Sequence, residues 1–204
     1  MIEFISLISV IIVIIMLRRI VGILPAVFAC TLRWKECVKL DSFLKTSRDR
    51  DLTALALILP VMLTIQRYTL LPYRFLDSMV PEAALGVITG IFVCYIGFRM
   101  FSALLFLPRK SHKKSRNPDY SERTFFIIIA VSILSVSWIM SLFHIDPTIT
   151  RHTIIWLSAA IYTLYLIRKF EFFQSSHSLF ASFLYLCALE IVPTGILVVS
   201  AIIF

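Results

Sequence analysis

The sequence predicts an all-α protein that crosses a membrane six times, and three observations predict it. Of the 204 residues, 59% are hydrophobic and only 16% are charged, and the mean hydropathy is +0.92. A soluble domain is about half apolar and a quarter charged. The apolar residues gather in six long runs, and Lys and Arg concentrate in alternate loops between them. Because no stretch remains for a soluble domain, we expect residues 1–204 to form a single integral-membrane domain.

Each of the six runs is a candidate transmembrane helix, because a hydrocarbon core of roughly 30 Å requires about 20 helical residues. The approximate bounds are 2–17, 52–71, 83–107, 124–143, 152–167 and 179–204. The first run is short, about 24 Å as a helix. Arg18 and Arg19 follow it directly and can extend to the headgroups, which makes up part of the difference.

Residues 26–45 mix apolar and basic side chains after Pro25. As a helix, this segment places Trp34 and other apolar side chains near one face and charged side chains elsewhere. That pattern predicts an amphipathic helix lying in the inner membrane interface. The alternative is a helical extension of the first span.

The third run carries small residues at helical spacing. Gly86 and Gly90 form a Gly-x-x-x-Gly pair, and Gly97 continues the same face seven residues later. Small residues at this spacing let another helix approach closely. The sequence therefore predicts a close-packing face here, without indicating whether the partner is another helix of this chain or a second copy.

The net charge of +8 and the pI of about 9.6 have a topological interpretation. The loops after the first, third and fifth runs hold 8, 6 and 2 Lys and Arg residues, whereas the loops after the second and fourth hold 2 and 1, counting Arg67 at the polar end of the second run. Cytoplasmic loops carry such an excess, so both termini are expected on the outer side. A nucleic-acid partner is not expected. The expected partners are the lipid bilayer and possibly other membrane proteins or a second copy.

Two charged residues lie deep inside the predicted spans. Glu190 is eleven residues from Leu179, about 16 Å into the membrane, and Arg99 is eight residues from Leu107, about 12 Å. An isolated charge at such depth costs at least a few kcal/mol. We therefore expect the two to form an intramembrane ion pair. The alternatives are a protonated Glu190 and an Arg99 that extends to the inner headgroups.

Pro193 lies three residues after Glu190 and breaks the helix beside it. Proline frees a carbonyl one turn back, and broken helices often line transport sites. Glu190 is thus either part of a proton, cation or substrate pathway, or a structural residue that joins the third and sixth spans.

No catalytic motif, cofactor site or strong metal site is present in the sequence. His144, Asp146 and His152 cluster around one outer turn and are weak metal-ligand candidates, because solvated loop residues are commoner there. We find no nucleophile elbow, phosphate loop or His-Glu-x-x-His. An enzymatic activity is therefore not expected, although an enzyme acting on lipid-linked substrates stays an alternative without a motif.

The stretch Leu184–Pro193, Leu-Tyr-Leu-Cys-Ala-Leu-Glu-Ile-Val-Pro, resembles a known family. It is similar to the C-terminal Leu-Tyr-x-Cys-x-Leu-Glu-Ile-x-Pro stretch of small uncharacterised inner-membrane proteins of the Bacteroidetes, a domain of unknown function. The resemblance is close over about ten residues and loose over most of the chain. It implies a bacterial inner (cytoplasmic) membrane and brings no activity.

These observations favour an accessory or assembly subunit of an envelope membrane complex. The alternative is a small proton-coupled transporter or carrier that uses Glu190.

Overall fold

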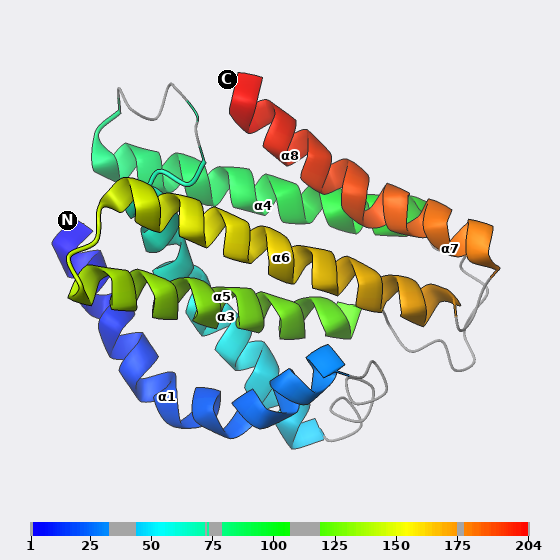
Figure 1. The fold of residues 1–204 in the computed structure, drawn as a ribbon, viewed down its shortest axis with the longest axis horizontal. Helices are drawn as coiled ribbons and strands as arrows, with labels where there is room; N and C mark the ends of the chain where they lie inside the picture. Colours follow the sequence, from blue (N-terminus) through cyan, green and yellow to red (C-terminus); the bar gives the residue numbers. More distant parts are fainter. Residues whose placement is uncertain are drawn as a thin grey trace. The chain divides into compact units, whose positions relative to one another are not determined.

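A computed structural model describes residues 2–32, 44–71, 73, 79–106, 119–174 and 178–203. Among these residues there is no strand, so the predicted all-α class is confirmed. The elements are, in chain order (Figure 1), α1 (Ile2–Leu32), α3 (Leu44–Arg67), α4 (Pro81–Phe106), α5 (Asp119–Leu142), α6 (Pro147–Gln174), α7 (Leu179–Leu186), the π-helix η2 (Cys187–Ile191) and α8 (Val192–Ile203).

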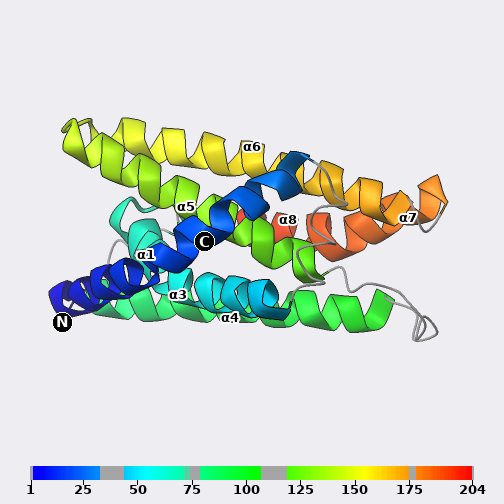
Figure 2. The same ribbon diagram turned by 90° about the horizontal axis from the view of Figure 1, so that it is seen from below.

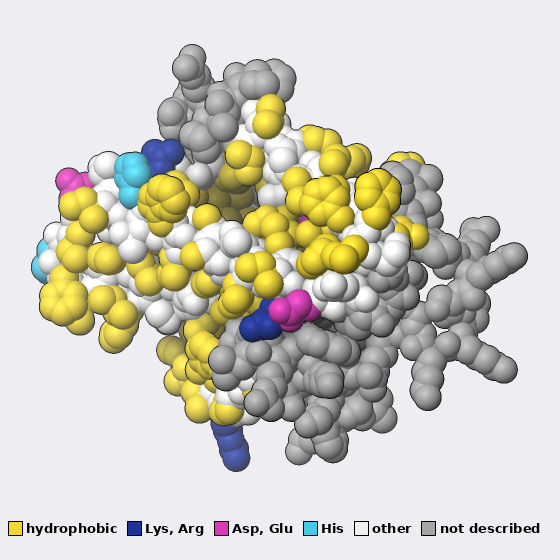
Figure 3. Space-filling view, turned by 45° about the vertical axis from the view of Figure 1, so that its right-hand side comes forward, with side chains coloured by type: hydrophobic (Ala, Val, Ile, Leu, Met, Phe, Trp, Pro, Cys, Tyr) yellow, Lys and Arg dark blue, Asp and Glu magenta, His cyan; other side chains and the backbone are white. Residues whose placement is uncertain are grey.

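Five segments of the described chain are long and apolar enough to cross a membrane. They are Glu3–Ala29, Pro81–Ser102, Glu122–Leu142, Pro147–Glu171 and Leu179–Ser200. Large apolar side chains such as Trp138, Trp156 and Phe180 are exposed on them, and Figure 3 shows hydrophobic side chains spread over one face of the molecule. Extensive exposed apolar surface marks contact with lipid or other proteins. The molecule is therefore an all-α membrane protein.

The second predicted span, residues 52–71, differs from the other five. A helix forms there, but α3 begins at Leu44 and ends at Arg67, so its first two turns include the charged segment 48–51 and it lacks Leu70 and Leu71. It is not among the five apolar segments. Its middle is instead buried by protein, with Leu57 and Met62 each only 2% exposed. A helix covered by its neighbours does not need a uniformly apolar surface.

The chain divides into two compact units, Met1–Leu70 with Pro118–Arg168 and Leu71–Asn117 with Lys169–Phe204. The first unit holds α1, α3, α5 and most of α6. The second holds α4, the last turns of α6, and the α7–η2–α8 helix. Each unit has its own polar contacts between helices.

In the first unit, α3 packs against both α1 and α5. Tyr68 at the end of α3 accepts a hydrogen bond from Ser137 near the end of α5, at 3.2 Å, so these two helices run in the same direction. The α5 and α6 helices run side by side in opposite directions (Figure 2), and the rings of Phe125 and Tyr165 lie 5.2 Å apart between them. The buried centre around α3 consists of Ile20, Ala54, Leu57, Val61, Ile127 and Ala130.

The α1 helix is longer than the predicted first span and changes the interpretation of residues 26–45. It continues through Pro25 to Leu32 as one helix. Residues 26–32 therefore extend the helix of the first span, and within them Val27 is buried with Phe125 and Tyr165. The prediction of a separate interfacial helix is wrong for these residues. An amphipathic helix can bury its apolar face against a membrane surface or against other helices, and here Val27 packs against α5 and α6. Residues 33–43 lie outside the described residues.

In the second unit, α4 lies antiparallel to the α7–η2–α8 helix. The predicted close-packing face of Gly86, Gly90 and Gly97 does not contact this partner. A Cβ atom built on any of the three would meet no atom within 4 Å in the described structure. No helix of the described chain therefore packs against these glycines, and a close approach by a second copy, which the spacing also allows, stays a prediction. The spacing of small residues shows where a helix can approach, but tertiary structure decides whether one does.

The packing of α1 gives a testable difference between two valines. We expect Val27→Ala to lower the free energy of unfolding by about 1 kcal/mol, because it leaves a cavity against α5 and α6. Val27 is 2% exposed and Val21 is 61% exposed. Thermal unfolding of the purified protein in detergent measures the effect, with Val21→Ala as the matched control. Equal melting temperatures for the two variants would contradict the packing of Val27 against α5 and α6.

Candidate functional site

The π-helix η2 interrupts the last membrane helix where Glu190 lies. In an α-helix, residue 193 would donate its backbone N–H to the carbonyl of Leu189, but Pro193 has no N–H and its ring crowds that carbonyl. The chain widens by one residue instead, and the N–H of Val192 donates to the carbonyl of Cys187, five residues back. Such π-turns are rare overall, and those that occur are often found at functional sites. The helix break predicted beside Glu190 thus takes the form of a widened turn that contains it.

Glu190 is in contact with two cations in the second unit. Arg99 Nη2 from α4 and Lys169 Nζ from α6 both donate to Glu190 Oε1. The Glu190 side chain is fully buried, that of Lys169 is 3% exposed and that of Arg99 is 20% exposed. We call these three residues the Glu190 cluster. The structure therefore brings together the two residues that the sequence analysis pairs, and adds a third.

Lys169 is the member that the sequence analysis missed. The apolar run predicts that the fifth span ends at residue 167 and that a loop follows it. The α6 helix instead continues to Gln174, since the segment after Ile167 contains no Pro or Gly to stop it. One signal was available, because Lys169 follows the aromatic Tyr165 by four residues and shares its helix face.

The contacts within the Glu190 cluster suit a structural role, in which the ion pairs hold neighbouring helices together. Burying an ion costs several kcal/mol, and a buried pair offsets this only with good geometry and additional hydrogen bonds. Here two charge-assisted hydrogen bonds converge on one oxygen, from two different helices. The cluster therefore holds α4, the end of α6 and η2 in one arrangement, because separating any member would leave a buried charge uncompensated.

Two hydroxyl contacts lie beyond the Glu190 cluster on the side of α8. One turn from Arg99 and Glu190, the hydroxyls of Tyr95 and Thr194 lie 3.2 Å apart. Further along, the hydroxyls of Tyr73 and Ser200 lie 3.0 Å apart. Polar contacts between membrane helices each contribute modestly, about 0.6 kcal/mol on average in measured cases. The Tyr95–Thr194 contact therefore supports the facing of α4 and α8, and the Tyr73–Ser200 contact connects α8 to the segment before α4.

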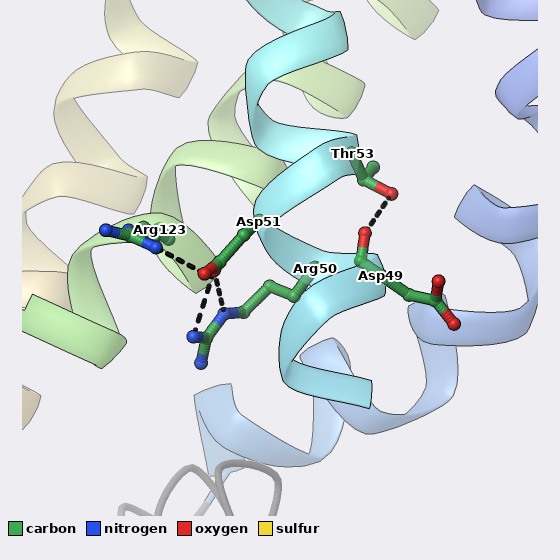
Figure 4. Close-up of polar contacts among 5 residues, drawn as sticks. All are labelled: Asp49, Arg50, Asp51, Thr53 and Arg123. Atoms are coloured by element: carbon green, nitrogen blue, oxygen red, sulfur yellow. Dashed lines mark hydrogen bonds and ion pairs between the residues drawn. The ribbon is translucent and has the colours of Figure 1, made fainter. Parts of the chain in front are cut away.

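A second charged cluster lies in the first unit, where α3 and α5 begin (Figure 4). Asp51 Oδ1 accepts hydrogen bonds from Arg50 Nε and Nη2, both at 3.1 Å, and Asp51 Oδ2 accepts one from Arg123 on α5. Two residues before Asp51 on α3, Asp49 lies 3.8 Å from Arg19 of α1. We call these five residues the Asp51 cluster. The sequence analysis did not foresee it, because it connects residues up to 72 positions apart.

The outer turn uses its polar residues locally. Asp146 Oδ1 accepts a hydrogen bond from the backbone N–H of Thr148 at 2.7 Å, as expected of a residue that caps a helix before Pro147. His152 Nδ1 donates to the Thr148 carbonyl at 2.8 Å, and His144 has a φ of 51° where the chain leaves α5. No group of three or more His, Cys, Asp or Glu residues in the described chain is arranged to hold a metal ion.

Comparison with known proteins adds no family assignment. A scan against protein-family models, a search of curated proteins and a search of solved structures each found no match. The resemblance of Leu184–Pro193 to a Bacteroidetes membrane family stays a prediction. The role of the two clusters therefore has to be argued from their geometry.

Removing the charge of Glu190 tests the structural role of its cluster. We expect Glu190→Gln to destabilise the protein by about 3 kcal/mol or more, because Arg99 and Lys169 would stay buried without a carboxylate. Replacing all three with apolar residues of similar size (Glu190→Leu, Arg99→Met, Lys169→Met) should recover much of that loss. Membrane abundance and the melting temperature in detergent measure both effects. A Glu190→Gln protein as abundant and stable as the original would contradict the structural role of the Glu190 cluster.

Asp146 gives a prediction about pH. The backbone N–H of Thr148, with a further contribution from its side chain, holds the pKa of Asp146 below its ordinary value of 3.8, against a small opposing effect of desolvation. A carboxylate with a lowered pKa stabilises the folded state above its ordinary pKa, and this stabilisation is lost as the pH falls through the lowered value. Asp146→Asn should therefore melt below the original protein at pH 7, and the difference should shrink as the pH falls below about 4. A difference in melting temperature that is constant with pH would contradict the assignment.

Proposed function

We propose that this protein is an integral membrane subunit that binds other membrane proteins, as an accessory or assembly component of an envelope complex. The observation that carries the proposal is the Glu190 cluster. The one carboxylate near the centre of a membrane helix in the second unit is fully buried and contacts two cations. Such a residue holds helices in place, and the remaining exposed surface of the helices is largely apolar and suited to lipid and to other membrane helices.

The proposal includes a location and an orientation. The resemblance of the Leu184–Pro193 stretch supports the inner membrane of a bacterium. The distribution of Lys and Arg supports cytoplasmic loops after the first, third and fifth spans, with both termini on the periplasmic side. Lys169 is buried in α6 and no longer counts as a loop residue. The excess of the odd loops over the even loops persists without it.

A proton-coupled carrier is the second candidate, and a specific observation favours it. The π-helix around Glu190 is a widened turn beside a proline, and two hydroxyl pairs lie beyond Glu190 on the side of α8: Tyr95–Thr194 between α4 and α8, and Tyr73–Ser200 between α8 and the segment before α4. Hydroxyl groups both donate and accept hydrogen bonds. A line of them that leads to a buried carboxylate has the chemistry of a proton pathway.

Purification from the native membrane separates the two candidates. We expect the tagged protein, extracted in mild detergent, to co-purify with at least one other integral membrane protein in fixed stoichiometry, measured by quantitative mass spectrometry. An apolar control bait with a similar number of spans, expressed at the same level, identifies non-specific partners. A homogeneous monomer or homodimer without a partner would contradict the subunit proposal and favour the carrier.

A further inference from the structure

The Asp51 cluster gathers three arginines at one end of the first unit, and we propose that it binds the phosphate group of an anionic phospholipid. Arg19, Arg50 and Arg123 come from α1, α3 and α5. The two carboxylates between them, Asp49 and Asp51, neutralise only part of this charge. The inference is independent of the function proposed above, because a subunit and a carrier can each bind a lipid.

The buried and exposed arginines of the cluster have different parts in this site. The Arg50 side chain is fully buried and contacts Asp51 through two of its nitrogens. Asp51 is thereby held in one orientation and in turn fixes Arg123 through its other oxygen. The Arg123 and Arg19 side chains are 51% and 47% exposed. The buried Arg50 thus orients Asp51 and, through it, Arg123, whereas Arg19 lies beside Asp49.

The chemistry of guanidinium favours phosphate as the ligand. Its five N–H donors lie in a rigid plane that matches the oxygens of phosphate, and arginine is the preferred residue for such recognition. In the described contacts, Arg123 uses Nη1 towards Asp51, and Arg19 Nη1 approaches Asp49 only at 3.8 Å. Both can therefore donate to a phosphate while they keep their carboxylate partners.

An apolar side chain close to the cluster favours a lipid as the source of that phosphate. Leu55 follows Asp51 by one turn on α3, so it shares the helix face of Asp51, and its side chain is 70% exposed. A phospholipid has both a phosphate for the arginines and acyl chains for this surface. Free phosphate would use only the charges.

Lipid binding to the purified protein tests the proposal. The delipidated protein is titrated with phosphatidylglycerol and with phosphatidylcholine of the same acyl chains, and bound lipid is counted by native mass spectrometry. We expect the original protein to prefer phosphatidylglycerol. Arg19→Gln and Arg123→Gln should each reduce this preference about fivefold, from the typical contribution of one basic residue near anionic lipid.

Matched control variants and a competition with inorganic phosphate show whether the preference depends on the cluster arginines and on the lipid. Arg18→Gln removes an exposed arginine beside Arg19, and Arg151→Gln removes a partly exposed arginine near the start of α6; neither belongs to the cluster. These two controls should keep the preference of the original protein. If Arg19→Gln or Arg123→Gln fails to fold, Arg19→Lys and Arg123→Lys keep the charge but lose the planar fork, and they should still lower the preference.

Four outcomes would overturn the inference. One is an equal affinity for the two lipids, and another is an equal loss in the control and cluster variants, which would indicate non-specific attraction. The third outcome combines two results: inorganic phosphate fails to displace phosphatidylglycerol, and the cluster variants bind the lipid as well as the original protein does. Inorganic phosphate that binds alone, through Arg19 and Arg123, at an affinity equal to that of the lipid would retain the phosphate chemistry and refute the lipid as its source.

Discussion

A buried carboxylate in a membrane helix is the constraint on which the second unit depends. Glu190 cannot reach water from its fully buried position, so cations must come to it. They come from α4 and from the end of α6, segments that lie 91 and 21 residues away along the chain. The register between α4 and the last helix follows from this contact, and the hydroxyl pair Tyr95–Thr194 one turn away is consistent with the same register. Pro193 explains why the helix widens at this point.

The two charged clusters use the same chemistry in different surroundings. In the Glu190 cluster all three side chains are largely buried, so its charges serve one another and the helices that carry them. In the Asp51 cluster, Arg50 is buried while Arg19 and Arg123 are half exposed, so part of the charge is presented to the surroundings. The difference in burial therefore gives the two clusters different roles. The Glu190 cluster joins helices, and the Asp51 cluster presents a surface that can bind an anion.

The extent of α1, α3 and α6 shows why hydropathy alone misplaced some boundaries. Each of the three helices extends beyond the apolar run from which it was predicted, because neither charged residues nor a proline near a helix end stops a helix that packs against its neighbours. The buried Lys169, the position of Val27 and the charged start of α3 all follow from these extensions. Gly86, Gly90 and Gly97 show the converse. Their spacing would let a helix approach, but no helix of the described chain packs against them.

The sequence by itself determined the all-α class, five of the apolar membrane helices and the unusual position of Glu190. These features follow from composition and local periodicity, because the bilayer requires long apolar helices and makes every charge within them costly. Only the tertiary structure decided which cations meet Glu190, that α3 is buried by protein, and that Asp51 joins Arg50 to Arg123. The physical reason is that these contacts depend on which helix faces approach each other. That is set by packing between distant segments, and no local pattern in the sequence records it.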